Sequence, residues 1–165
     1  GVEGMMPTLD DWSDHLTTLF PEVRLKRFLE MRGADGGRWS TITALSAFWT
    51  GLLYDEAALE AAWRLVKPWT DEEREALRNG VPKSGFALGF RETSVNEIAR
   101  EAVRISRLGL KNRKRINAKS QDETLYLAPL EAIVSTRRTV SDDLLQRYNG
   151  RWNGDIDRIF EEFAF

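Results

Sequence analysis

The sequence predicts an α+β fold that is mostly helical and contains one main strand. Over most of the 165 residues, apolar side chains recur at intervals of three and four, and helix-capping residues precede these stretches. Between Pro21 and Gly33 the pattern changes, because apolar and polar residues alternate there with the period of two of an extended strand. These two patterns together indicate the fold class.

The chain begins with a short predicted helix and continues into the strand. Thr8 followed by Asp11 is a capping pattern for a helix that runs to about Leu19 and that Pro21 closes. The strand then has one apolar face, which Arg27 interrupts, and one charged face. The apolar face comprises Val23, Leu25, Leu29 and Met31, and the charged face comprises Arg24, Lys26, Phe28, Glu30 and Arg32.

The next stretch predicts two helices. We expect a deeply buried helix from about Thr43, because this segment has too few polar residues for an exposed face. Its apolar residues are Leu45, Phe48, Trp49, Leu52 and Leu53. Asp55 is expected to cap a second helix over 56–66, which ends before Pro68.

A third helix and an irregular loop follow. Thr70 with Glu73 is a predicted capping box for this helix. The residues expected to stop it are Asn79, Gly80 and Pro82. Residues 83–90 then predict an irregular loop that Phe86 and Phe90 pack against the body of the protein.

The C-terminal half predicts four more helices. Ser94 with Glu97 opens the longest of them. Its inward stripe consists of Val95, Ile98, Ala102, Ile105 and Gly109. Three further helices are expected over 122–136, 140–148 and 155–163, with turn residues between them.

Composition narrows the classes of partner. The 24 basic and 26 acidic residues leave a net charge of −2, which gives no general attraction to nucleic acid or to an anionic membrane. The sequence contains no apolar run as long as a membrane span and no signal-like N-terminus, and we expect a cytoplasmic location without membrane or nucleic-acid partners. Because cysteine is absent, these residues hold no disulfide, thiolate nucleophile or zinc-cysteine site.

The longest predicted helix is strongly basic on its other faces. Its cations are Arg100, Arg104, Arg107 and Lys111, followed by Arg113, Lys114 and Arg115. A basic helix can bind nucleic acid, but Glu97 and Glu101 lie among these charges, and cations near a helix C-terminus are favoured by its dipole. We therefore interpret these residues as a solvated or pocket-lining face.

Isolated aromatic and histidine residues favour structural roles. His15 is the only histidine, and a histidine without neighbouring ligands is more often structural than metal-binding. We interpret the six tryptophans as packing residues. Trp39 is the exception, because it closes the glycine loop and is close enough in sequence to Asp35 for both to border one pocket.

The charged strand face is the candidate site. Glu30 and Arg32 are two residues apart and point the same way, at the end of a strand that runs into Gly33, Gly36 and Gly37. A carboxylate is a hard ligand for Mg²⁺, which takes only one or two protein carboxylates, and an arginine can fork onto phosphate oxygens. Glycines allow backbone to approach a ligand closely. The alternative is an ordinary surface strand, which also carries polar residues on one face.

A longer string of residues carries a family resemblance. Residues 14–37 (DHLTTLFPEVRLKRFLEMRGADGG) and 47–55 (AFWTGLLYD) closely resemble glutamate-cysteine ligase of the plant and proteobacterial type. The resemblance continues more loosely through 122–131 (DETLYLAPLE) to 161–165 (EEFAF), so that it covers nearly the whole chain. It implies ATP-dependent joining of the glutamate side-chain carboxylate to the cysteine amine, the first step of glutathione synthesis.

The resemblance also implies a fold and a set of site residues. The family's catalytic domain is similar to that of glutamine synthetase, so the strand is expected to contribute to a glutamine-synthetase-like catalytic sheet. By this match Glu30 is the metal ligand, and Arg32 is the catalytic and phosphate-binding arginine. Further substrate- or phosphate-binding candidates near them are Arg24, Lys26, Asp35 and Trp39. The implied cofactors are ATP and Mg²⁺, and the implied partners are L-glutamate, L-cysteine and the remainder of the same polypeptide.

Family members are much longer than this chain, so we expect residues 1–165 to be the C-terminal part of one catalytic domain. Within it, 1–20 hold an N-terminal helix, 21–39 the active-site strand and glycine-rich loop, and 40–165 a helical region. Two alternatives stay open. One is a related carboxylate-amine ligase that uses another acceptor amine, and the other is a non-enzymatic helical interaction module with a basic helix.

Overall fold

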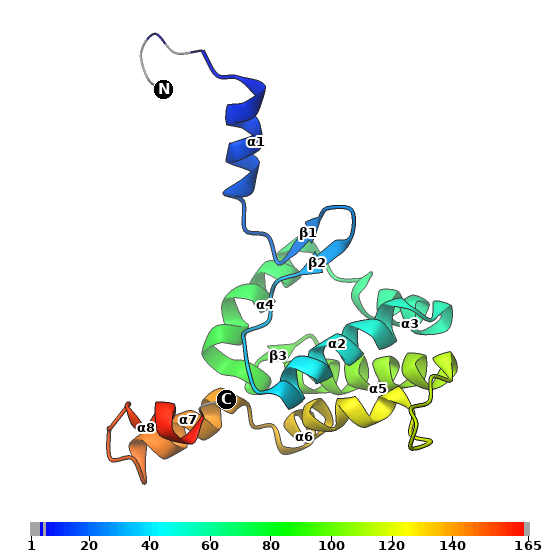
Figure 1. Cartoon of the computed structure of the whole chain (residues 1–165), viewed down its shortest axis with the longest axis vertical. Coiled ribbons are helices and arrows are strands. Elements are labelled where there is room, and N and C mark those ends of the chain that lie inside the picture. Colours follow the sequence, from blue (N-terminus) through cyan, green and yellow to red (C-terminus); the bar gives the residue numbers. More distant parts are fainter. Residues whose placement is uncertain (1–3, 5, 164–165) are drawn as a thin grey trace. The chain divides into compact units, whose positions relative to one another are not determined.

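The computed structural model describes residue 4 and residues 6–163, which form mostly helices with two small pairs of antiparallel strands (Figure 1). The α+β class predicted from the sequence is therefore confirmed. The chain divides into two compact units, Gly1–Gly36 and Gly37–Phe165. We call them the hairpin unit and the helical unit. No helix among the described residues is long and apolar enough to cross a membrane.

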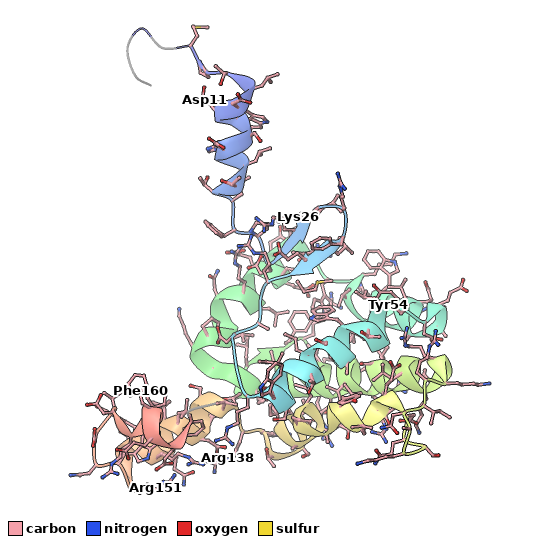
Figure 2. All side chains as sticks on the ribbon, in the orientation of Figure 1. Asp11, Lys26, Tyr54, Arg138, Arg151 and Phe160 are labelled. Carbon is pink, nitrogen blue, oxygen red and sulfur yellow. The ribbon has the colours of Figure 1, made fainter. Side chains whose placement is uncertain are left out.

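The hairpin unit begins with the capped helix that the sequence predicts. In α1 (Leu9–Thr17) the Thr8 hydroxyl accepts a hydrogen bond from the Asp11 N–H (3.1 Å), and the Asp11 carboxylate accepts one from the Thr8 N–H (2.7 Å). Two orphan amide donors of the first turn are satisfied in this way. Figure 2 shows Asp11 on this helix and Lys26 on the hairpin that follows it.

The prediction of one continuous strand over 21–32 is wrong, because the segment folds back on itself. It forms β1 (Val23–Leu25) and β2 (Leu29–Met31), which pair antiparallel, with Arg24 opposite Glu30. The Lys26 N–H donates to the Phe28 carbonyl (2.9 Å) and closes the turn. The turn between the strands has three residues. Because this number is odd, apolar and polar residues keep alternating with a period of two from β1 through the turn into β2. The sequence of the hairpin therefore has the same pattern as one continuous strand.

The helical unit is built on a close crossing of α2 (Trp39–Leu53) and α5 (Val95–Arg113). A Cβ on Gly109 would lie 1.9 Å from the Gly51 carbonyl oxygen, so the two backbones touch at this point. Ser106, which is fully buried, donates its hydroxyl hydrogen to the Phe48 carbonyl (2.9 Å). Small residues therefore fix the distance between the two helices.

The helix expected from Thr43 differs from its prediction in two ways. It starts earlier, at Trp39, and its buried residues are mostly small, because close contact with α5 leaves little space there. They are Ala44, Ala47, Gly51 and Leu52, whereas Leu45, Phe48, Trp49 and Leu53 are only half-buried. The buried residues of α5 are Asn96, Val103, Ile105, Ser106, Gly109 and Leu110, so only Ile105 and Gly109 of the predicted stripe are fully inside.

The next two helices begin where predicted. In α3 (Glu56–Val66) the Asp55 carboxylate accepts from the Ala58 N–H (2.9 Å). The capping box that opens α4 (Asp71–Ser84) is also present, but the predicted stop is wrong, since Pro82 lies inside this helix. A proline in the last turn removes only one helical hydrogen bond, and the 3₁₀ turn η1 (Gly85–Ala87) continues the chain.

Residues 83–90 are more regular than the predicted loop. After η1 the chain forms the short pair β3 (Gly89–Phe90) and β4 (Thr93–Ser94). Phe90 is buried and meets Trp69 edge to face at 5.0 Å, so its packing role is confirmed, whereas Phe86 is half-buried.

The C-terminal third contains the remaining helices. The segment predicted over 122–136 is the 3₁₀ turn η2 (Glu123–Leu127) followed by α6 (Ala128–Thr136). Beyond it lie α7 (Val140–Asn149) and α8 (Arg158–Glu162), of which α8 is shorter than predicted. Of the five tryptophans interpreted as packing residues, Trp12 and Trp63 are exposed, so the interpretation holds only for the other three.

Candidate functional site

The candidate site is the charged hairpin face, which we define by Arg24, Lys26, Glu30 and Arg32. Arg24 and Glu30 are cross-strand partners, and the Arg24 Nε lies 2.7 Å from the Glu30 Oε2. Both side chains are about one-third exposed, at 29% and 33%. The hydrogen bond from Arg24 lowers the pKa of Glu30, and the charges of Lys26 and Arg32 act in the same direction. Glu30 is therefore ionised at neutral pH.

Arg32 is held on this face by contacts that leave part of its guanidinium unused. Its backbone N–H donates to the Glu22 carbonyl (2.7 Å), and its guanidinium lies over the Phe20 ring at 5.0 Å. The Nη1 atom is buried and has no hydrogen-bond partner in the described part of the chain. Buried donors are rarely left without an acceptor, so this N–H group is able to donate to an oxygen from outside the described chain.

The face has three cations for one carboxylate. Arg24, Lys26 and Arg32 all act electrostatically on Glu30, so together they carry an excess of positive charge. Such an excess suits a ligand with several negative oxygens, such as a polyphosphate or a carboxylate.

Glu30 is the one acidic group of the face that suits a metal. The described residues contain no group of three or more His, Cys, Asp or Glu side chains that could hold a metal ion. Mg²⁺ takes one or two protein carboxylates and fills its other positions with phosphate oxygens and water. Glu30 therefore fits as a single magnesium ligand, provided that Arg24 gives up its ion pair.

Asp35 and Trp39 stand apart from the charged hairpin face in different ways. Asp35 is exposed in the glycine loop at the end of the hairpin unit. Trp39 is the first residue of α2 in the helical unit and is 74% exposed. Asp35 and Trp39 therefore belong to different units, and a pocket bordered by both residues stays a prediction.

The basic face of α5 is paired with carboxylates. Arg104 meets Glu101 at 2.7 Å, and Arg107 meets Glu131 on α6 at 2.6 Å. Arg100 and Arg113 also form ion pairs, with Glu97 and Glu123. These internal pairs use much of the charge that a nucleic-acid backbone would need, which favours the solvated interpretation of this face.

Sequence reasoning missed two aromatic contacts near the predicted site. Phe20 contacts Arg32, and Phe163 contacts Arg38 at the end of the glycine loop. Phe20 is one residue outside the strand pattern, so the period of two gave no signal for it. Phe163 lies far away in sequence, and no local pattern connects it to Arg38.

Comparison with known proteins gives a consistent result over almost the whole chain. Residues 2–162 match the family described as glutamate-cysteine ligase family 2 (GCS2). The chain is 45% identical over 164 residues to the chloroplastic glutamate-cysteine ligase of Nicotiana tabacum. It is 46% identical to that of Solanum lycopersicum and 44% identical to that of Arabidopsis thaliana, also over 164 residues. Each match covers 99% of this chain but only 30% of the relative.

These relatives correct one prediction. They are named as chloroplastic enzymes, which contradicts the cytoplasmic location expected from the sequence. A compartment is specified by a targeting segment, whereas the residues that match these relatives belong to the folded body of the protein. The composition of such a body carries no signal for the compartment.

Proposed function

We propose a function for this chain from one established premise: it belongs to glutamate-cysteine ligase family 2. In our proposal the chain is the part of a longer ligase that binds the phosphates of ATP, while the whole protein joins the γ-carboxylate of L-glutamate to the amine of L-cysteine. The observation that carries the proposal is the charged hairpin face. It combines the unpartnered Nη1 of Arg32 with an ionised carboxylate on which three cations act, and this combination supports the proposal.

The reaction has two steps in this proposal. An oxygen of the glutamate γ-carboxylate attacks the γ-phosphorus of ATP, so that an O–P bond forms while the bond to ADP breaks. The cysteine nitrogen then attacks the carbonyl carbon of the acyl phosphate. A C–N bond forms, the bond to phosphate breaks, and the amine gives up a proton. The protein chiefly has to position these groups and to stabilise negative charge.

Arg32 has the central role. Its guanidinium would bind an oxygen of the transferring phosphoryl group through Nη1, where charge increases in the transition state. Two contacts hold Arg32 in place before the ligand arrives. Its guanidinium lies over the Phe20 ring, and its backbone N–H donates a hydrogen bond to the Glu22 carbonyl. Because the donor is already oriented, little reorganisation is needed when the phosphoryl group moves.

The other residues of the face would bind and orient ligands. Glu30 would hold Mg²⁺, which when bound offsets the negative charge of the phosphates. Once Glu30 is engaged in this way, Arg24 becomes free to bind a phosphate or substrate carboxylate oxygen, as does Lys26 on the turn. We expect Asp35, within the glycine loop, and Trp39, just after the loop, to contribute to substrate or phosphate binding. Residues 1–165 would thus belong to one catalytic domain.

The test uses the full-length protein that contains this chain. Arg32→Lys keeps the charge but removes the forked donor, so glutamate- and cysteine-dependent ADP release should fall roughly 10²- to 10³-fold. Arg27→Lys is the matched control, because Arg27 is exposed on the turn of the same hairpin. Equal rates in both variants would remove the charged hairpin face from the mechanism.

A second measurement tests the metal ligand and the acceptor. Glu30→Gln keeps the shape of the side chain but removes its charge, so the Mg²⁺ concentration needed for half-maximal activity should rise. Activity of the wild-type protein with another amine and none with cysteine would replace the proposed reaction by that of a related carboxylate-amine ligase. Absence of ADP release with any amine would favour the interaction module.

A further inference from the structure

Phe163, near the C-terminus, contacts Arg38, the residue that follows the glycine loop. Phe163 contacts two guanidinium groups, with the Arg38 Cζ 4.5 Å and the Arg147 Cζ 5.1 Å from the centre of its ring. The edge of the Trp152 ring system also meets it, at 6.2 Å and 88°. An aromatic ring attracts cations to its face, so this arrangement fixes both arginines.

Phe163 is itself anchored by the residue before it. The Glu162 carboxylate accepts from the Trp152 Nε1 (2.8 Å) and from the Arg147 Nη1 (2.8 Å), and it also pairs with Arg151. Trp152 is only 4% exposed. In Figure 2 Arg151 and Phe160 mark this small cluster of α7 and α8. The cluster therefore forms a firm base from which Phe163 contacts Arg38.

Arg38 is the junction between the glycine loop and the helical unit. It occupies the N-cap position of α2, where a guanidinium cannot cap because it has no acceptor, and this guanidinium lies over the Phe163 ring instead. Its carbonyl accepts from the N–H groups of Thr41 (2.9 Å) and Ile42 (3.0 Å). A Cβ on Gly37 would lie 2.4 Å from the Thr41 hydroxyl, so the turn into α2 is tight.

The position of this junction matters for the proposed site. Only five residues lie between Arg32 and Arg38 in the sequence. Trp39, one of the predicted ligand-binding residues, directly follows Arg38. Any freedom in the backbone of Arg38 therefore passes directly to Trp39, its neighbour in the helical unit.

We propose that Phe163 is a positioning residue for ATP binding: through Arg38 it holds the end of the glycine loop, and with it Trp39, in place. The proposal rests on the proposed function, because it takes the loop as part of the ATP site. It gives the last helical segment of this chain a part in substrate affinity that neither the sequence pattern nor the family match assigns.

The test replaces Phe163 in the full-length protein by leucine, which keeps an apolar side chain but removes the ring face. The change removes the cation–π contacts with both Arg38 and Arg147, and loss of the Arg38 contact alone corresponds to about a two- to five-fold change in an equilibrium constant. We expect KM for Mg-ATP to rise by this factor, with kcat and the thermal unfolding midpoint unchanged. Phe163→Tyr, which keeps the ring, should restore the wild-type KM. Phe160→Leu, the same change at an exposed site on α8, is the control.

Two further results decide whether Phe163 acts through Arg38. Arg38→Met should raise KM similarly, and the double variant should be no worse than Arg38→Met alone. Additive effects, or a fall in kcat and unfolding midpoint without a change in KM, would overturn the proposal. A wild-type protein without cysteine-dependent ADP release would instead overturn the proposed function. In that case the rate of trypsin cleavage after Arg38 tests the positioning role of Phe163 without any activity measurement. Phe163→Leu should accelerate this cleavage, and an unchanged rate would refute the positioning role.

Discussion

The two units of the chain differ in what determines their structure. In the helical unit, Ala44, Ala58 and Leu110 are completely buried, and α2 and α5 touch backbone to backbone. In the hairpin unit no described residue is buried, and even Leu25 is 78% exposed. Yet the hairpin unit holds the charged face. The helical unit is thus determined by packing among its own residues, whereas the side chains of the hairpin unit stay accessible.

This difference implies that substitutions should separate into two classes. Changes at the crossing of the helical unit should lower stability, because close-packed groups have no room to adjust. Changes on the charged hairpin face should lower activity while leaving stability nearly unchanged, because little surface is buried there. The following predictions test this separation in the full-length protein.

The largest effect on stability is expected at the helix crossing. Gly109→Ala places a methyl group 1.9 Å from the Gly51 carbonyl oxygen and 2.9 Å from the Ala58 Cβ. We expect a loss of about 3 kcal/mol in the free energy of unfolding, measured in urea. Gly89→Ala is the control, because a Cβ there meets nothing within 4 Å. Similar losses for both variants would show that backbone contact does not set the stability of the helical unit.

A smaller loss is expected from the buried hydroxyl at the same crossing. Ser106→Ala removes the hydrogen bond to the Phe48 carbonyl and should reduce the free energy of unfolding by about 1 kcal/mol. Ser46→Ala changes an exposed serine of α2 and should stay within about 0.5 kcal/mol of wild type. If Ser106→Ala left the free energy of unfolding unchanged, the close contact of α2 and α5 would depend on the glycines alone.

An acid-dependent effect is expected where Arg91 holds the start of α4. Arg91 donates two hydrogen bonds to the Glu73 carboxylate, which lower the pKa of Glu73 from 4.5 to about 2. Because the pKa is depressed in the folded state, the stabilisation is complete above pH 4.5 and is lost as the pH falls towards 2. Unfolding midpoints between pH 6 and 3 should therefore fall less steeply for Glu73→Gln than for wild type, whereas Glu92→Gln should follow wild type.

Removal of the Glu30 charge should separate stability from function. Glu30→Gln breaks an ion pair that is partly exposed, and such pairs contribute little to stability. The unfolding midpoint should stay within the range of a neutral surface substitution, while glutamate- and cysteine-dependent ADP release falls. A clear fall in the unfolding midpoint with normal kinetics would contradict this prediction, because Glu30 would then contribute to stability and not to activity.

The smallest effect concerns the basic helix. Since Arg104 and Arg107 are paired with carboxylates, the full-length protein should not bind duplex DNA or RNA, even at low salt. Fluorescence anisotropy at about 20 mM salt would reveal weak binding. Micromolar affinity that declines with each arginine replaced by glutamine would show that the internal ion pairs do not neutralise this face.

The sequence predicted the parts of the fold that local rules determine. The caps at Thr8, Asp55, Thr70 and Ser94 lie where expected, because a cap depends on residues within one turn. The buried face of α2 was predicted less well, since a close backbone contact with α5 replaces large apolar residues by small ones. That contact joins segments more than fifty residues apart, which no periodicity within α2 can indicate.

The site was predicted in its chemistry but not in its geometry. The grouping of Glu30 with Arg24, Lys26 and Arg32 was expected from their alternation, and the odd-numbered turn preserved that alternation while it reversed the chain direction. The ion pair between Arg24 and Glu30 arises only from this reversal. The contacts of Arg32 with Phe20 and of Arg38 with Phe163 depend on tertiary packing, and a single sequence carries no signal for them.

The glycine contact between α2 and α5 also determines how a displacement passes through the helical unit. Because the two backbones touch, no layer of rotatable side chains lies between them to absorb a small shift. A movement at the start of α2, where the glycine loop joins it, therefore carries α5 with it. In hydrogen exchange, the amides of the two helices around Gly51 and Gly109 should consequently open together, as one slowly exchanging block.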